Sequence, residues 1–234
     1  MEAVGRVART LLPGLALFVL SANLAPIALA AGAGGVVFAG RELSPEDLRR
    51  LGDGEILTRW EDAAGPNRMV ASAGTLPVSP RDAWALATDF RNYDRIYSGI
   101  SESRVVSEAA REVVGTYTLK LPWPLPQRWV TTRAVLEPER RLCSWQKEAG
   151  TVKAYAGHLQ MLPWAGRRTL MLYSARIDPD FAFLPTWFWD WAQETALPSV
   201  VSGLRDTFAR QEGPYWQARI RRPDFEFVGR RESP

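Results

Sequence analysis

The sequence has one cysteine and one histidine in 234 residues, and the shortage of each removes a class of site. Cys143 has no partner for a disulfide within the chain, so the core must be stabilised by burial alone. His158 cannot form a multi-histidine metal site by itself, and no cysteine pair assists it, which argues against structural zinc. We therefore predict no metal and no cofactor, and we expect Cys143 to be a small buried residue in a strand.

Signatures of nucleotide binding and of common hydrolases are also missing. The chain has no G-x-S-x-G elbow and no phosphate-binding loop, and the glycine-rich stretch 31–35 has no strand before it, as in a linker. The formal net charge of +3 is too small to indicate nucleic acid as a partner without a concentrated basic face. An enzyme that needs only a shaped cavity and one acid or base stays open, with a tyrosine, Arg128 or His158 as the acid or base.

Residues 1–30 have the pattern of a targeting segment. Arg6 and Arg9 precede an apolar run at 11–20, and the sequence Ala-Leu-Ala at 28–30 offers small residues at the positions that signal peptidase requires. The alternative is an uncleaved anchor, because residues 11–31 are uncharged and a spanning helix needs about 20 residues. Either interpretation predicts an exported protein, periplasmic or secreted, and the second also anchors it to the membrane.

Two helix starts are marked by the same capping pattern. Ser44 is followed by proline and then by Asp47, and Ser79 is followed by proline and then by Asp82. The first helix is predicted to end at Gly52. A further short helix follows the second, because three aromatic residues, Phe90, Tyr93 and Tyr97, have helical spacing.

Between residues 101 and 178 the apolar pattern changes to alternation, which is typical of half-buried strands. Strands are predicted at 55–60, 68–76, 113–121, 129–137, 142–148, 152–162 and 168–178, with turns between them, the first at 63–67. No helical pattern lies between the strands from 113 onward, so we predict an antiparallel meander and exclude a parallel α/β sheet.

The last predicted element is a long helix at 187–212. Its apolar stripe consists of Leu197, Val201, Leu204 and Phe208, and Gly213-Pro214 ends it. Pro198 is predicted to kink this helix, because proline lacks the backbone donor and clashes with the preceding turn.

Three segments of the chain resemble START-like proteins. They read LGDGEILTRW at 51–60, PVSPRDAWALATDFRNYDRIYSGISESRVV at 77–106 and LPWPLPQRWV at 121–130. The resemblance covers residues 51–211, and the superfamily includes polyketide cyclases and coenzyme Q-binding proteins. It implies an α+β helix-grip fold, in which a curved antiparallel sheet wraps around a long C-terminal helix and two short helices follow the second strand.

The resemblance and the element pattern together predict four regions along the chain. They are a signal peptide or anchor at 1–30, a linker with a short helix at 31–54, a START-like domain at 55–212 and a polar tail at 213–234. Similar proteins carry lipids or other hydrophobic ligands, and a minority are cyclases, hydrolases or other enzymes. The resemblance therefore implies one fold but leaves several functions open.

A sheet curled over one helix leaves space that is either a core or a pocket. The strand alternation points Tyr117, Tyr155, Met161, Met171 and Tyr173 toward this space. Further ligand-contact candidates are Trp84, Tyr93, Tyr97, Trp123, Arg128, His158, Trp187 and Trp191. The alternative for each hydroxyl is an ordinary core position bonded to a backbone group, and for His158 a hydrogen-bonded strand position.

The segment 181–191, FAFLPTWFWDW, contains six aromatic residues that do not share one helical stripe. Extrapolating the stripe of the long helix backward places Phe188 nearly opposite it and Trp189 to one side. We predict that Phe188 and Trp189 contact a membrane transiently; the alternative is packing against the N-terminal segment or the sheet rim. The rigid loop at 121–126 places Trp123 at a second candidate rim.

These observations predict binding, and transfer, of a hydrophobic ligand, most simply a lipid, in an internal cavity near a membrane. A cyclase or aromatase-like enzyme with an apolar substrate in the same cavity is the alternative. A cavity filled by side chains would leave a third class, an interaction module whose aromatic face binds a protein.

Overall fold

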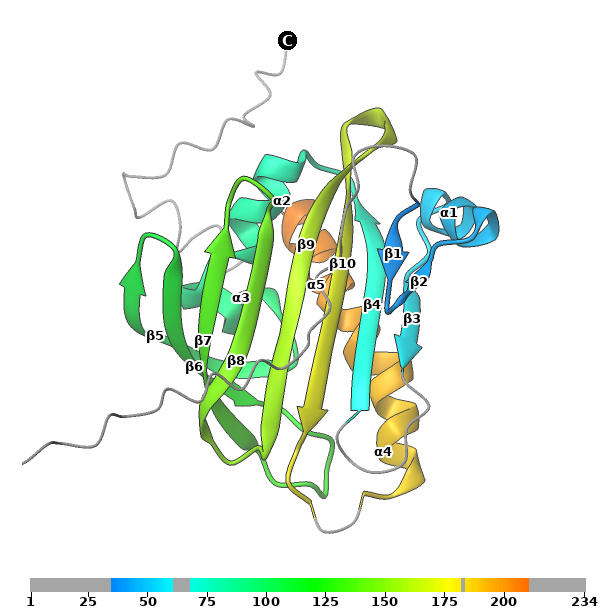
Figure 1. Ribbon diagram of the computed structural model, residues 1–234. Helices are drawn as coiled ribbons and strands as arrows, with labels where there is room; N and C mark the ends of the chain where they lie inside the picture. The colour runs from blue at the N-terminus through cyan, green and yellow to red at the C-terminus, as the bar shows by residue number, and fades with distance from the viewer. Residues whose placement is uncertain (1–34, 61–67, 182–183, 211–234) are drawn as a thin grey trace, which may run out of the picture.

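The computed structural model describes residues 35–60, 68–181 and 184–210. Their centre is an eight-stranded antiparallel sheet with the strand order β3-β4-β10-β9-β8-β7-β6-β5 (Figure 1). The strands are β3 (Leu57–Trp60), β4 (Arg68–Leu76), β5 (Ile100–Ala109), β6 (Glu112–Leu119), β7 (Arg128–Glu137), β8 (Leu142–Gly150), β9 (Ala154–Trp164) and β10 (Arg168–Asp178). A separate two-stranded sheet contains β1 (Val37–Phe38) and β2 (Arg41–Glu42).

The strands from β6 to β10 form the meander that the alternation predicted, and β4 pairs with β10 at one side. At the other side β5, which was not among the predicted strands, pairs with β6. The β4–β10 ladder runs in continuous register from Leu76 opposite Thr169 to Arg68 opposite Ile177. Register shifts interrupt the β5–β6 and β7–β8 ladders. Such irregularities increase local twist and bend, which helps the sheet to curve.

The two predicted helix caps are confirmed. Helix α1 (Pro45–Gly52) begins with a reciprocal capping box, in which the Ser44 side chain accepts from the Asp47 amide and the Asp47 carboxylate accepts from the Ser44 amide. In α2 (Pro80–Ala87) the Ser79 side chain accepts from the amide of Asp82. The aromatic spacing after α2 becomes the 3₁₀ turn η1 (Phe90–Asn92) and the short helix α3 (Tyr93–Ile96).

The C-terminal helix is continuous but has three parts: α4 (Thr186–Trp191), the π-helical turn η3 (Ala192–Ala196) and α5 (Leu197–Ala209). Pro198 lies in the first turn of α5, directly after the π-helical turn. The missing proline donor is thus accommodated by a change in helical winding. The predicted stripe is confirmed, because the side chains of Leu197, Val201, Leu204 and Phe208 are all buried.

The helix packs on the concave face of the sheet, behind the strands in Figure 1. The main core, which includes Leu76, Met161, Met171 and Leu204, lies at this face. Gly203 permits the helix to approach α3, since a Cβ at Gly203 would lie 2.6 Å from the carbonyl oxygen of Ile96.

A second core covers the convex face near β3, β4 and β10. It joins Phe38, Leu51, Leu57, Leu170 and Leu172, so α1 and the β1–β2 hairpin shield this part of the sheet. The fold is the helix-grip fold predicted from the sequence: a curved antiparallel sheet closed by a long C-terminal helix.

Three of the predicted segments lie outside the described ranges. They are the signal peptide or anchor at 1–30, the turn at 63–67 and the polar tail at 213–234. Within the described ranges, no helix has the length and apolar character needed to cross a bilayer.

Candidate functional site, a cavity between sheet and helix

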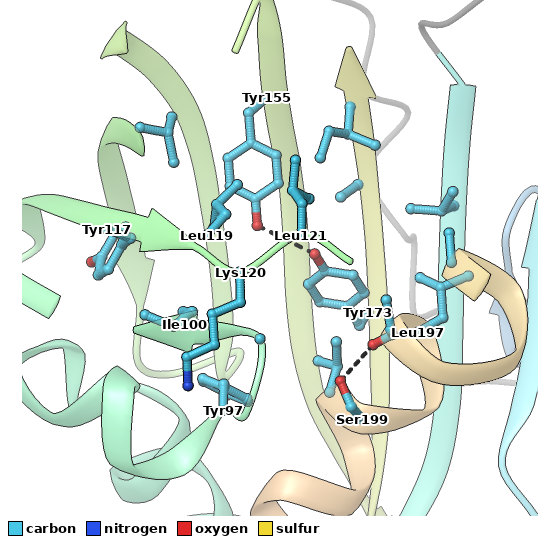
Figure 2. A pocket seen from close by; sticks show the side chains of 18 of the residues that line it. Tyr97, Ile100, Tyr117, Leu119, Lys120, Leu121, Tyr155, Tyr173, Leu197 and Ser199 are labelled. Carbon is cyan, nitrogen blue, oxygen red and sulfur yellow. Dashed lines mark hydrogen bonds between the residues drawn. The ribbon is translucent and has the colours of Figure 1, made fainter. Parts of the chain in front are cut away.

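A cavity of about 470 Å³ lies between the concave face of the sheet and the C-terminal helix (Figure 2). Strands β4 and β6 to β10 form its wall, and α4, η3 and the beginning of α5 close it. Its exposed lining residues mark the mouth: Ser98, Gly99, Lys120 and Thr195. The space beneath the curled sheet, predicted to be either core or pocket, is therefore in part a pocket.

One wall consists of tyrosines from α3 and β6. The Tyr93 ring stacks on Tyr117 with ring centres 5.3 Å apart and meets Tyr97 edge-on at 5.0 Å. The Tyr93 hydroxyl donates to the carbonyl of Ala87 at 2.7 Å, so it is already satisfied by the backbone. Burial raises the pKa of all three tyrosines above the ordinary phenol value, which keeps these hydroxyls neutral.

The opposite wall places Trp145 (β8), Tyr155 (β9) and Tyr173 (β10) side by side. The Trp145 ring lies 5.9 Å from Tyr155 and 5.5 Å from Tyr173, centre to centre. Gly157 makes room for it, because a Cβ there would lie 2.6 Å from Trp145 Cζ2. The Tyr155 and Tyr173 hydroxyls face each other at 3.3 Å, as Figure 2 shows.

Phe188 and Trp189 lie in the helix wall, and the prediction that they are exposed for membrane contact was wrong. Both were expected to be exposed or to meet a second surface, and their exposed fractions are 4% and 8%. The Trp189 ring meets the Trp60 ring edge-on, with ring centres 6.4 Å apart. The guanidinium carbon of Arg68 lies 4.6 Å from the centre of the Trp189 ring. Both side chains pack against the rim of the sheet, which was the alternative interpretation. Both also line the cavity, together with Trp191.

Other predicted residues lie close to the mouth and outside the cavity. Trp123 is 91% exposed in the β6–β7 loop, next to the lining residue Pro122. Trp187 is 40% exposed on α4. Arg128 donates to the carbonyls of Pro179 and Asp180, and its guanidinium lies 4.1 Å from the ring centre of Phe181. Arg128 therefore joins the base of the β6–β7 loop to the connection between β10 and α4.

Four predicted residues lie away from the cavity. Met161 and Met171 do face the concave side, but α2 and α5 cover that end of the sheet and bury them in the main core. Trp84 packs at the edge of the same core. His158 pairs with Ser144 and Ser174 on the opposite face, where burial lowers its pKa and keeps the ring neutral.

Trp145 is a cavity residue that the sequence analysis missed, although a signal existed. It lies two residues after Cys143 in one strand, and the predicted burial of Cys143 fixes the inward face for both. Lys120 was missed as well; it is the only charged residue among the described residues that line the cavity. Among the described residues, no three His, Cys, Asp or Glu side chains gather in a metal-binding group.

Cys143 is buried beside the cavity and is expected to be chemically inert in the folded protein. Burial raises its pKa to about 12, so thiolate is scarce at pH 8. Ellman's reagent should label the native thiol about a thousandfold more slowly than a free thiol, and at the ordinary rate in denaturant. Rapid labelling of the native protein would contradict the described packing. The readout is unambiguous because the chain has one cysteine.

A family model described as polyketide cyclase / dehydrase and lipid transport matches residues 76–205, more than half of the chain. The chain belongs to this family. In this family member the matched region begins at the end of β4 and ends within α5. It therefore contains most of the residues that line the cavity. No curated protein matches the chain in sequence.

Solved structures show the same fold at low sequence identity. Human STARD10 is similar with a TM-score of 0.55 and 15% identity, over 80% of this chain and 86% of its own. A STAR-related lipid transfer protein from Xanthomonas axonopodis gives a TM-score of 0.54 and 16% identity, over 66% and 93%. A protein from Thermus thermophilus gives 0.54 and 14%, over 62% and 99%. This family member therefore has the START-like helix-grip fold.

Proposed function

We propose that this protein binds a hydrophobic small molecule, most simply a lipid, in the cavity between sheet and helix and exchanges it with a membrane. The supporting observation is the cavity itself: about 470 Å³ of space with aromatic and aliphatic walls, in which the described part of the chain places a single charged residue, Lys120, at the mouth. Pockets of this size and character suit ligands that bury most of their surface. Apolar burial supplies the binding free energy, at about 25 cal/mol per Å².

Co-purification tests the binding proposal. The protein is purified from its natural host without detergent and extracted with organic solvent, and the extract is compared by mass spectrometry with that of a denatured sample. A carrier retains about one apolar molecule per chain. An extract that contains none, from a protein that also takes up none from added lipid, would overturn the proposal.

We propose that the protein contacts the membrane with the end of the domain at which the cavity opens. Trp123 and Trp187 are exposed there, and the bonds of Arg128 hold the two loops of this end together. Indole rings are favourable at the membrane–water boundary, because their body is apolar and their N–H stays hydrated. The exposed pair thus replaces Phe188 and Trp189 as the proposed membrane-contact residues.

A Trp123→Ala/Trp187→Ala double variant should bind vesicles of phosphatidylcholine and phosphatidylglycerol about tenfold more weakly than the wild type, measured by co-sedimentation. Val106→Ala/Val135→Ala is the control, since it removes two exposed apolar side chains from β5 and β7. Equal binding by both double variants would remove the membrane contact and leave the cavity proposal intact.

Catalysis of the cyclase type is the second candidate, and the tyrosine hydroxyls inside the cavity favour it. They can donate hydrogen bonds to a substrate carbonyl, but burial raises the pKa of Tyr155 and Tyr173, so they stay protonated at neutral pH and little phenolate is available as a base. The same extraction separates the candidates, because a carrier retains its ligand and a cyclase releases its product.

A further inference from the structure

Three hydrogen-bonding groups gather on the sheet wall of the cavity, on the neighbouring strands β8, β9 and β10. They are the indole N–H of Trp145 and the hydroxyls of Tyr155 and Tyr173. Gly157 lies opposite Trp145 in the ladder, and its lack of a side chain allows the indole to lie across β9 toward both tyrosines. The three groups therefore form one polar cluster within an otherwise apolar wall.

Not every hydrogen-bond donor of this cluster has a good acceptor. The bond between the Tyr155 and Tyr173 hydroxyls, at 3.3 Å, engages only one of their two protons. The Trp145 N–H is buried and makes no hydrogen bond of normal length and angle among the described residues; its contact with the Tyr155 hydroxyl is weak. A buried donor with only a weak bond is costly, so an added acceptor atom would stabilise this cluster.

The surroundings restrict the charge of such an acceptor. Val70, Leu159, Ala175 and Ile177 line the cavity around the cluster, and all are aliphatic. An ionised carboxylate or phosphate at this depth would need a cation beside it. Lys120, the one charged residue among the described residues of the lining, is exposed at the mouth and belongs to the segment after β6 (Figure 2).

We propose that Trp145, Tyr155 and Tyr173 bind an uncharged acceptor oxygen, such as the carbonyl of a ketone, ester or amide, on an otherwise apolar ligand. This inference rests on the proposed function and narrows it to molecules whose buried end carries an uncharged carbonyl oxygen. A charged head group, where a ligand has one, is left at the mouth beside Lys120.

A matched pair of probes tests the inference. 2-Acetylnaphthalene and 2-ethylnaphthalene differ by a carbonyl oxygen in place of two hydrogens, and their dissociation constants are measured by equilibrium dialysis. The Tyr155→Phe/Tyr173→Phe variant should bind the ketone about tenfold more weakly and the hydrocarbon within about twofold of wild type. Trp145→Phe should weaken ketone binding selectively as well.

Tyr93→Phe is the control, because the Tyr93 hydroxyl lies in the same cavity but already donates to the backbone of Ala87. It should leave the preference for the ketone unchanged. The infrared carbonyl band of the bound ketone provides an independent readout, and it should move to higher frequency in the double tyrosine variant as the hydrogen bonds are lost.

The outcomes separate this inference from the proposed function. Binding of both probes with equal losses in the double tyrosine variant, or with no change in the carbonyl band, would overturn the acceptor site and retain the apolar cavity. Failure of both probes to bind the wild type would overturn the cavity proposal and this inference with it.

Discussion

An Ala196→Trp variant should fold normally and lose ligand binding. Ala196 lies on η3 and lines the cavity, so an indole in its place occupies the volume that a ligand would fill. The dissociation constant for N-phenyl-1-naphthylamine, an uncharged dye that fluoresces in apolar surroundings, should rise about a hundredfold or more. The free energy of unfolding should change by only about 1 kcal/mol, because the new side chain enters existing space.

The matched control is Glu194→Trp, which places the same indole two residues away on the same helical turn. Glu194 is exposed and is not part of the described cavity wall. This control should bind the dye like the wild type. Equal dye binding by the Ala196 and Glu194 variants would show that the dye does not occupy the described cavity.

A Gly157→Ala variant should destabilise the protein by about 3 kcal/mol. A Cβ at Gly157 would lie 2.3 Å from the carbonyl oxygen of Ser174 and 2.6 Å from Trp145 Cζ2. The neighbouring strand cannot withdraw without breaking the β9–β10 ladder, and Trp145 cannot move without entering the cavity. Urea unfolding followed by circular dichroism measures the change.

Gly52→Ala provides the comparison for this substitution. Gly52 is the last residue of α1, and a Cβ there would meet no atom within 4 Å. Its unfolding free energy should stay within about 1 kcal/mol of the wild type. A Gly157→Ala variant as stable as Gly52→Ala would contradict the close packing of Trp145 on β9.

The helices and strands were predictable because their signals are local, whereas their helix-grip arrangement was implied by the resemblance to START-like proteins. The Ser-Pro-x-Asp patterns marked both helix starts, and the apolar alternation located the strands to within a few residues at most ends. β5 is the exception, since its burial pattern alternates only weakly. As an edge strand it has one neighbour, and few of its side chains need to be buried.

The cavity wall was predictable in part. Alternation placed Tyr117, Tyr155 and Tyr173 on the concave face, and all three line the cavity. Met161 and Met171 share that face, yet strand alternation does not tell which end of the sheet the helices cover. Only the packing of α2 and α5 decides that these two are core.

The positions of Phe188 and Trp189 were not predictable from the helical stripe. The extrapolation assumed one α-helical period through Pro198, whereas the chain adopts a π-helical turn at Ala192–Ala196. A π-helical turn contains more residues than an α-helical one and rotates every preceding side chain about the axis. This rotation brings Phe188 and Trp189 toward the sheet.

The space between sheet and helix is unfilled by the protein and accessible from outside. Crystals of the protein soaked with 1-bromonaphthalene test it directly, because bromine gives an anomalous signal. We predict an anomalous peak inside the cavity, within contact distance of Tyr97, Tyr155 and Trp191. A map in which the protein's own side chains fill that space, with no bromine peak, would contradict an open cavity and the binding proposal with it.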